Sequence, residues 1–116
     1  MSTITMYGIA NCDTIKKAKN WFEKRQIPYV FHDYKKSGMD KDLLEMWVLE
    51  MGWEPLLNKR GTTFRKLDDA DKADLDRDKA IALMLQHPSM IKRPVIEHDG
   101  GVLVGFSEEA WTSALQ

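Results

Sequence analysis

The sequence has very little cysteine, because Cys12 is the only one among its 116 residues. A single cysteine cannot close a disulfide within the chain, and it cannot supply the several thiolates of a structural zinc site. Disulfide stabilisation and a structural metal centre are therefore excluded, and we expect no metal cofactor. Any chemistry at Cys12 must use a partner from outside the chain.

The sequence also lacks an excess of charge and a long apolar segment. Seventeen basic and eighteen acidic side chains leave a formal net charge of −1, which favours neither a nucleic-acid partner nor a membrane surface. No stretch approaches the roughly 20 apolar residues of a membrane-spanning helix. The first ten residues lack the basic region and the apolar run of a signal peptide. We expect a cytoplasmic protein.

What the sequence does have is the composition of a globular domain, with 43% apolar and 30% charged residues. A length of 116 residues fits one domain with one core. We therefore expect a single domain over residues 1–116, and we expect it to be a monomer.

The alternation of apolar residues and turn formers predicts the order of the elements. Residues 3–9 are rich in β-branched and aromatic types and predict a strand. The spacing of apolar residues from Asp13 predicts a helix that ends before Pro28. The alternating run over 29–34 predicts a second strand. Two strands separated by a helix suit a parallel, right-handed β-α-β unit.

The middle of the chain is predicted to be a helical insertion at about 39–88. One amphipathic helix ends at Gly52 and another, over 80–85, ends before Pro88. A polar segment over 56–63 and a charged, short helical stretch over 68–79 lie between them.

The last part is predicted to be a hairpin followed by a helix. Strands over 94–98 and 102–106 are joined by Asp99-Gly100-Gly101, and a helix begins at Ser107. The order β-α-β, helical insertion, β-β-α is that of an α/β, thioredoxin-like fold with a mixed sheet.

Cys12 lies where the first strand turns into the first helix. The first turn of a helix presents unpaired N–H groups and the positive end of the helix dipole, which stabilise a thiolate. Lys16, four residues further on, adds positive charge. A buried, inert cysteine is the alternative, but Cys12 stands between Asn11 and Asp13 in a polar loop, which favours a reactive nucleophile.

The third position after Cys12 is Ile15, where a two-cysteine redox motif has its second thiol. A mixed disulfide at Cys12 must then be resolved by an external thiol. Glutathione is the expected co-substrate, and its two carboxylates need cationic anchors.

Two arginines are candidates for binding an anionic partner. Arg60 lies in a polar loop, and Arg93 comes directly before Pro94 at the start of a predicted strand. An X-Pro bond that opens a strand is a possible cis site, and in thioredoxin-like folds a cis proline faces the nucleophile and aligns the bound substrate. The sequence alone leaves the isomer open.

Several spaced motifs carry a resemblance to a known family. These motifs are Tyr7-Gly8-Ile9, Asn11-Cys12-Asp13-Thr14, Asn58-Lys59-Arg60-Gly61-Thr62-Thr63, Ile91-Lys92-Arg93-Pro94 and Leu103-Val104-Gly105-Phe106. Over nearly its whole length the chain resembles the arsenate reductase (ArsC) and Spx family, most closely the YffB-type branch. The resemblance implies a thioredoxin-like fold and a glutathione-dependent thiol reductase.

The resemblance also implies roles for individual residues. Cys12 matches the nucleophile, Arg60 falls in the segment of the first anion-binding arginine, and Arg93 matches the second. The third arginine of arsenate reductases has no match, since its segment reads Leu103-Val104-Gly105-Phe106-Ser107. The loop Ile9-Ala10-Asn11 lacks the histidine and proline that precede the arsenate reductase nucleophile.

The leading hypothesis is therefore an oxidoreductase with Cys12 as catalytic residue. Arg60, Arg93, Pro94, Asn11 and Lys16 are its expected substrate- or glutathione-binding residues. Arsenate reduction is one alternative. The alternative of a different class is an Spx-like regulator that binds RNA polymerase through its helical face without turnover. The second cysteine of the Spx branch is absent, which excludes an intramolecular disulfide switch.

Overall fold

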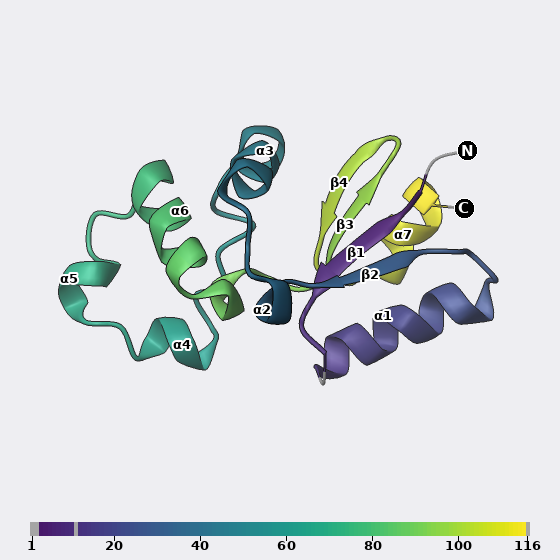
Figure 1. The fold of residues 1–116 in the computed structure, drawn as a ribbon, viewed down its shortest axis with the longest axis horizontal. Coiled ribbons are helices and arrows are strands. Elements are labelled where there is room, and N and C mark those ends of the chain that lie inside the picture. The colour runs from purple at the N-terminus through teal and green to yellow at the C-terminus, as the bar shows by residue number, and fades with distance from the viewer. Residues whose placement is uncertain (1–2, 11, 116) are drawn as a thin grey trace. The chain divides into compact units, whose positions relative to one another are not determined.

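The computed structural model describes residues 3–10 and 12–115, and the chain divides into two compact units (Figure 1). The first unit comprises Met1–Lys36 and Arg93–Gln116, and the second comprises Ser37–Lys92. The second unit covers the region that the sequence predicts as a helical insertion at about 39–88. The assignment of residues 1–116 to a single domain stays a prediction.

The first unit is built on a four-stranded mixed sheet in the order β2-β1-β3-β4. β1 and β2 are parallel, while β3 runs antiparallel to both of its neighbours, β1 and β4. The elements are β1 (Thr5–Gly8), α1 (Asp13–Lys24), β2 (Val30–Asp33), α2 (Tyr34–Ser37), β3 (Val95–His98), β4 (Gly101–Val104) and α7 (Glu108–Leu115). This arrangement confirms the predicted α/β, thioredoxin-like fold with a mixed sheet.

The sheet order brings four chain segments to the same end of the sheet. Parallel pairing places Gly8 opposite Asp33, so β1 and β2 finish side by side. β3 is antiparallel to β1 and therefore begins at that end, just after Arg93-Pro94. The backbone N–H of Gly105, which follows β4, donates to the carbonyl of Pro94 at 2.8 Å. In open α/β sheets, ligands bind beyond the carboxyl ends of the parallel strands.

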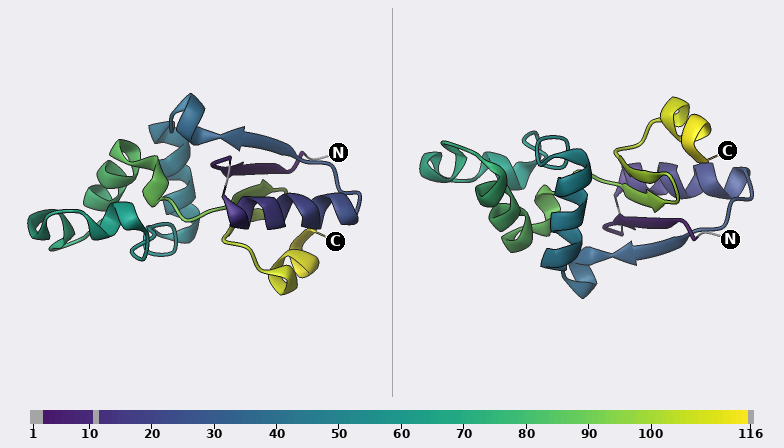
Figure 2. Two further views of the ribbon diagram at one scale, coloured as in Figure 1. Left: turned by 90° about the horizontal axis from the view of Figure 1, so that it is seen from below. Right: turned by 90° about the horizontal axis from the view of Figure 1, so that it is seen from above.

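The core of the first unit lies between one face of the sheet and helices α1 and α7 (Figure 2). The buried positions of α1 recur every three or four residues, which puts them on one face of the helix. Trp21 of α1 meets Trp111 of α7 edge to face, with ring centroids 5.3 Å apart. The buried cluster consists of Met6, Ile15, Ala18, Trp21, Phe22, Ile96 and Trp111.

Gly8 allows α1 to begin close to the end of β1. A Cβ atom at position 8 would lie 2.4 Å from the Cδ1 atom and 3.1 Å from the Cγ1 atom of Ile15. Ile15 is buried in the first turn of α1. The first turn therefore packs against the backbone of β1, and this contact fixes the start of the helix.

The second unit is helical. Two of its helices have an aspartate cap, because Asp40 accepts from the N–H of Asp42 and Asp76 accepts from the N–H of Lys79. An isolated antiparallel backbone pairing between Leu57 and Ile91 connects the segment after α3 to the last residues of the unit. Its elements are α3 (Lys41–Met51), α4 (Thr62–Arg65), α5 (Asp69–Lys72), α6 (Arg77–Gln86) and the 3-10 helix η1 (Pro88–Met90).

The structure corrects several predicted boundaries. Tyr34, predicted in a strand, begins α2 because the Asp33 carboxylate accepts from the N–H groups of Lys35 and Lys36, at 2.9 and 3.2 Å. The charged stretch over 68–79 is not one helix, since Asp74 has a φ of 53° between α5 and α6. The polar segment predicted over 56–63 runs at its end into a short helix, α4. The strand predicted over 102–106 ends before Gly105, whose φ is 81°.

Among residues 3–10 and 12–115, no helix has the length and apolar character that crossing a membrane requires. In the same part of the chain, no three histidine, cysteine, aspartate or glutamate side chains gather as a metal site would require.

We predict that Gly8→Ala lowers the free energy of unfolding by about 1–3 kcal/mol, because the new methyl group overpacks the core beside Ile15. Ile15→Val removes the Cδ1 atom that lies nearest. The cost of Gly8→Ala should therefore be smaller in an Ile15→Val background, as measured by urea unfolding of the four proteins of this cycle. Equal costs in both backgrounds would show that the crowding does not involve Ile15.

Candidate functional site

Cys12 is the N-cap residue of α1, with φ −105° and ψ 133°. Its carbonyl accepts the first bond of the helix, from the N–H of Lys16 at 3.0 Å. The side chain is partly buried and packs against the core of the first unit. The thiol therefore lies at the positive end of α1, as the sequence predicts.

The surroundings of Cys12 favour the thiolate. Partial burial raises the pKa of the thiol. The N–H groups of Ile15 and Thr14 and a hydrogen bond from the Arg93 side chain lower the pKa, and together they outweigh burial, so the net pKa lies below its usual value. The positive charge of Arg93 acts in the same direction. A thiolate of this kind is a nucleophile toward disulfides and other electrophilic sulfur.

Arg93 reaches Cys12 from the start of β3. The Arg93–Pro94 peptide bond is cis, which answers the question that the sequence left open. Pro94 is buried, and its carbonyl is paired with Gly105 after β4. Arg93 and Pro94 thus stand at the same end of the sheet as Cys12.

Tyr34 is a second partner of Arg93. The side chain of Tyr34 is fully buried, and its hydroxyl oxygen is hydrogen-bonded to the Arg93 side chain. Burial raises the pKa of Tyr34 above its usual value, although the charge and hydrogen bond of Arg93 oppose this increase. Tyr34 is therefore a neutral group that contacts the arginine beside Cys12.

Asp33 holds the loop that leads to Cys12. One oxygen of its carboxylate accepts from the N–H of Ala10 at 3.2 Å, while the other accepts from the N–H groups of Lys35 and Lys36. Burial raises the pKa of this carboxyl, but the three N–H groups together outweigh burial, so the net pKa is lowered. A single ionised side chain at the end of β2 thus connects the Cys12 loop to the first turn of α2.

The structure brings together three of the residues predicted from the sequence: Cys12, Arg93 and Pro94. The side chain of Lys16 is exposed on α1, and its predicted role stays a prediction. Arg60 belongs to the second unit, where its side chain is exposed and its N–H donates to Asn58 at 3.1 Å. Asn11 lies outside the described residues.

Sequence reasoning missed Tyr34 and Asp33. For Asp33 a signal existed, since an aspartate before a lysine-rich turn is a common helix cap. Tyr34 gave no such signal, because an aromatic residue at the end of an alternating run is typical of a strand. Its contact with Arg93 depends on the pairing of β1 with both β2 and β3.

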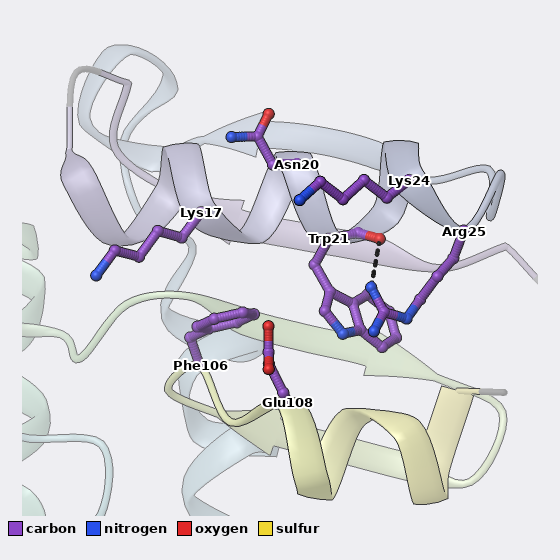
Figure 3. Close-up of a pocket in the computed structure, with 7 residues that line it drawn as sticks. All are labelled: Lys17, Asn20, Trp21, Lys24, Arg25, Phe106 and Glu108. Atoms are coloured by element: carbon purple, nitrogen blue, oxygen red, sulfur yellow. Dashed lines mark hydrogen bonds between the residues drawn. The ribbon is translucent and has the colours of Figure 1, made fainter.

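A pocket of about 330 Å³ lies along α1, on the side of the helix next to α7 (Figure 3). The guanidinium of Arg25 lies 4.4 Å above the Trp21 ring and donates to the Trp21 carbonyl at 3.4 Å. Three cationic side chains and one carboxylate surround the pocket, so its rim is positively charged. The lining residues are Lys17, Asn20, Trp21, Lys24, Arg25, Phe106 and Glu108.

The chain is similar to known proteins over almost its whole length. The chain matches the model of the ArsC family over residues 7–114. It is 55% identical to a solved YffB protein, with a TM-score of 0.94, over 98% of this chain and 100% of that one. It is also 50% identical to an arsenate reductase (ArsC) related protein from Brucella melitensis, with a TM-score of 0.78, over 97% of this chain and 93% of that one.

A curated relative from Haemophilus influenzae is described only as an uncharacterized protein. It is 43% identical over 111 residues, which are 96% of this chain and 97% of the relative. Together the matches extend over almost the full length of the chain and agree with the resemblance carried by the sequence motifs.

We predict that Arg93→Ala raises the pKa of the Cys12 thiol, because the hydrogen bond and the positive charge that favour the thiolate are lost. The pH dependence of alkylation by iodoacetamide measures this change. Arg25→Ala is the matched control, since its guanidinium lies over Trp21. An unchanged pH profile in Arg93→Ala would show that Arg93 does not stabilise the thiolate.

Proposed function

The chain belongs to the ArsC family, and on that premise we propose that it is an oxidoreductase, specifically a glutathione-dependent thiol-disulfide reductase that acts in the cytoplasm. One observation carries the proposal: the only thiol of the chain lies at the start of a helix, where backbone N–H groups and Arg93 lower its pKa. This is the environment of a reactive cysteine.

The proposed reaction has two exchanges. In the first, the Cys12 thiolate attacks the glutathione sulfur of a mixed disulfide, so a new Cys12–glutathione disulfide forms and the substrate thiolate leaves and takes up a proton. In the second, a glutathione thiolate attacks the glutathione sulfur of that adduct. Oxidised glutathione is released, and the Cys12 thiolate is regenerated. In sum, one free glutathione and one mixed disulfide become the substrate thiol and oxidised glutathione, and the glutathione thiol is the reductant.

The single cysteine favours this scheme over one in which a second cysteine of the same chain resolves the adduct. With no second thiol in the chain, the adduct on Cys12 has to be resolved by a free thiol. Glutathione suits this step because its thiol is external and its carboxylates are anions that arginine side chains bind.

The proposal assigns the binding of the anionic partner to cationic side chains. Arg93 beside Cys12 and Arg60 of the second unit are its main candidates, Asn11 and Lys16 flank the nucleophile, and Pro94 shapes the groove. The positively charged rim of the pocket along α1 supports the same assignment. Lys17 lies five residues along α1 from Cys12, or about 7.5 Å at the helical rise per residue, within the reach of a tripeptide.

We predict that the wild-type protein reduces a glutathione mixed disulfide at the expense of glutathione, and that Cys12→Ser abolishes this activity. Arg93→Ala should lower kcat/KM by about tenfold, because a charge-assisted hydrogen bond to the thiolate is lost. Coupling to glutathione reductase and NADPH measures both effects, with Arg77→Ala as control because Arg77 is exposed and bonded to its neighbour Asp78.

Two results of this assay would contradict the proposal. Turnover that persists in Cys12→Ser would remove the nucleophile from the mechanism. Turnover of arsenate, with none of the mixed disulfide, would favour arsenate reduction, the alternative that shares the same thiolate and that the Brucella melitensis relative's description suggests.

A regulator without turnover is the second candidate, and one observation favours it. Met46 and Leu49 lie three residues apart on α3 and are 63% and 84% exposed, so one turn of this helix presents two large apolar side chains to solvent. In this role the helical face of the second unit would bind RNA polymerase. The expected result is then co-purification of polymerase with the wild type and its loss in Met46→Lys, with Glu50→Lys as control on the same helix. A wild type that retains no polymerase would remove this candidate.

A further inference from the structure

Tyr34 is a buried tyrosine whose hydroxyl contacts a charged side chain. Its side chain is fully buried, yet it carries a polar hydroxyl, and that hydroxyl is bonded to the side chain of Arg93. A buried hydroxyl that binds a charged group is kept in one orientation, because the surrounding core restricts the ring. Tyr34 is thus a rigid acceptor placed at the end of β2.

Arg93, by contrast, is a long side chain whose ordering is entropically unfavourable. An arginine loses about 2 kcal/mol of rotamer freedom when it is fixed in one geometry. Its guanidinium donates both to the Tyr34 hydroxyl oxygen and to the sulfur of Cys12. The planar fork can make both bonds at once, so the bond to the tyrosine directs the remaining N–H groups toward the thiol.

Asp33, the residue before Tyr34, holds the loop that carries Cys12. Asp33 accepts from the N–H of Ala10, in the loop that leads to Cys12. The end of β2 therefore holds the loop that carries the nucleophile through Asp33, and holds the cation through Tyr34. The charged groups that act on Tyr34 are Arg93, Cys12 and Asp33.

We propose that Tyr34 is a positioning residue, whose buried hydroxyl holds the Arg93 guanidinium against the Cys12 sulfur. It touches neither substrate nor glutathione, and it acts only through Arg93. The proposal rests on the thiolate chemistry of the proposed function. It adds the reason why a flexible arginine stays beside the thiol when no anionic ligand is bound.

The test is the pH profile of Cys12 alkylation in Tyr34→Phe, which removes only the hydroxyl oxygen. The profile should move to higher pH, with the alkylation rate on its lower limb reduced roughly threefold or more, as expected when one charge-assisted hydrogen bond is weakened. Tyr7→Phe is the matched control, because it removes another hydroxyl of the first unit, one that donates to Glu97 at 2.8 Å. Its profile should coincide with that of the wild type.

The double variant Tyr34→Phe/Arg93→Ala separates positioning from a general structural effect. If Tyr34 acts through Arg93, this double variant has the same alkylation profile as Arg93→Ala alone. A further shift in the double variant would overturn the proposal, as would a wild-type profile in Tyr34→Phe. Unfolding of Tyr34→Phe, observed by circular dichroism, would also overturn it, because the hydroxyl would then be needed for the fold itself.

The alkylation experiment requires no substrate, so its outcome is separate from that of the proposed function. A shifted profile in Tyr34→Phe together with no reduction of mixed disulfides would keep the positioning role and remove the reductase. An unshifted profile in Tyr34→Phe together with normal reduction of mixed disulfides would remove the positioning role and keep the reductase.

Discussion

The start of α1 directly after β1 is the constraint on which the site depends. Gly8 lets Ile15 pack against the end of the strand, so the first turn of the helix is held close to the sheet. Cys12 then caps this turn, and the N–H groups of Thr14 and Ile15 act on its sulfur. If the helix began elsewhere, the thiol would lose the groups that favour its ionised form.

The rest of the site is assembled by the order of the strands. β1 lies between β2 and β3, and the direction of each strand brings the end of β2 and the start of β3 to the end of the sheet where Cys12 lies. Asp33 and Tyr34 come from the first of these segments and Arg93 from the second. The cation from the start of β3 thus lies beside the thiol, while the hydroxyl and the carboxylate from the end of β2 contact that cation and the loop before Cys12.

Much of this arrangement could be predicted from local patterns. The alternation of residues over 3–9, the helical spacing from Asp13 and the turn at Asp99-Gly100-Gly101 each predict an element that the structure contains. Cys12 was predicted as a helix-start nucleophile because its neighbours are turn and cap formers, a property of adjacent residues. Arg93 was predicted because it precedes a proline that opens a strand, and the structure places it beside the thiol.

The predictions that failed depend on contacts rather than on patterns. Tyr34 belongs by its residue type to the alternating run of a strand, but the Asp33 carboxylate captures the N–H groups of Lys35 and Lys36 and turns the chain into α2. The charged stretch over 68–79 has enough helix formers for one helix, but the backbone at Asp74 is in the left-handed region and the helix ends before it. In both cases a local hydrogen bond or dihedral outweighs a weak propensity.

By itself, the sequence determined the fold class, the place of the single cysteine at a helix start and the lack of a second cysteine to pair with it, because these follow from composition and from patterns between neighbouring residues. Only the tertiary structure decided that Tyr34 and Arg93 meet, and that their contact lies beside Cys12. Residues so far apart in the sequence come together through strand pairing, and the hydrogen bonds between them depend on distances and directions that no local pattern encodes.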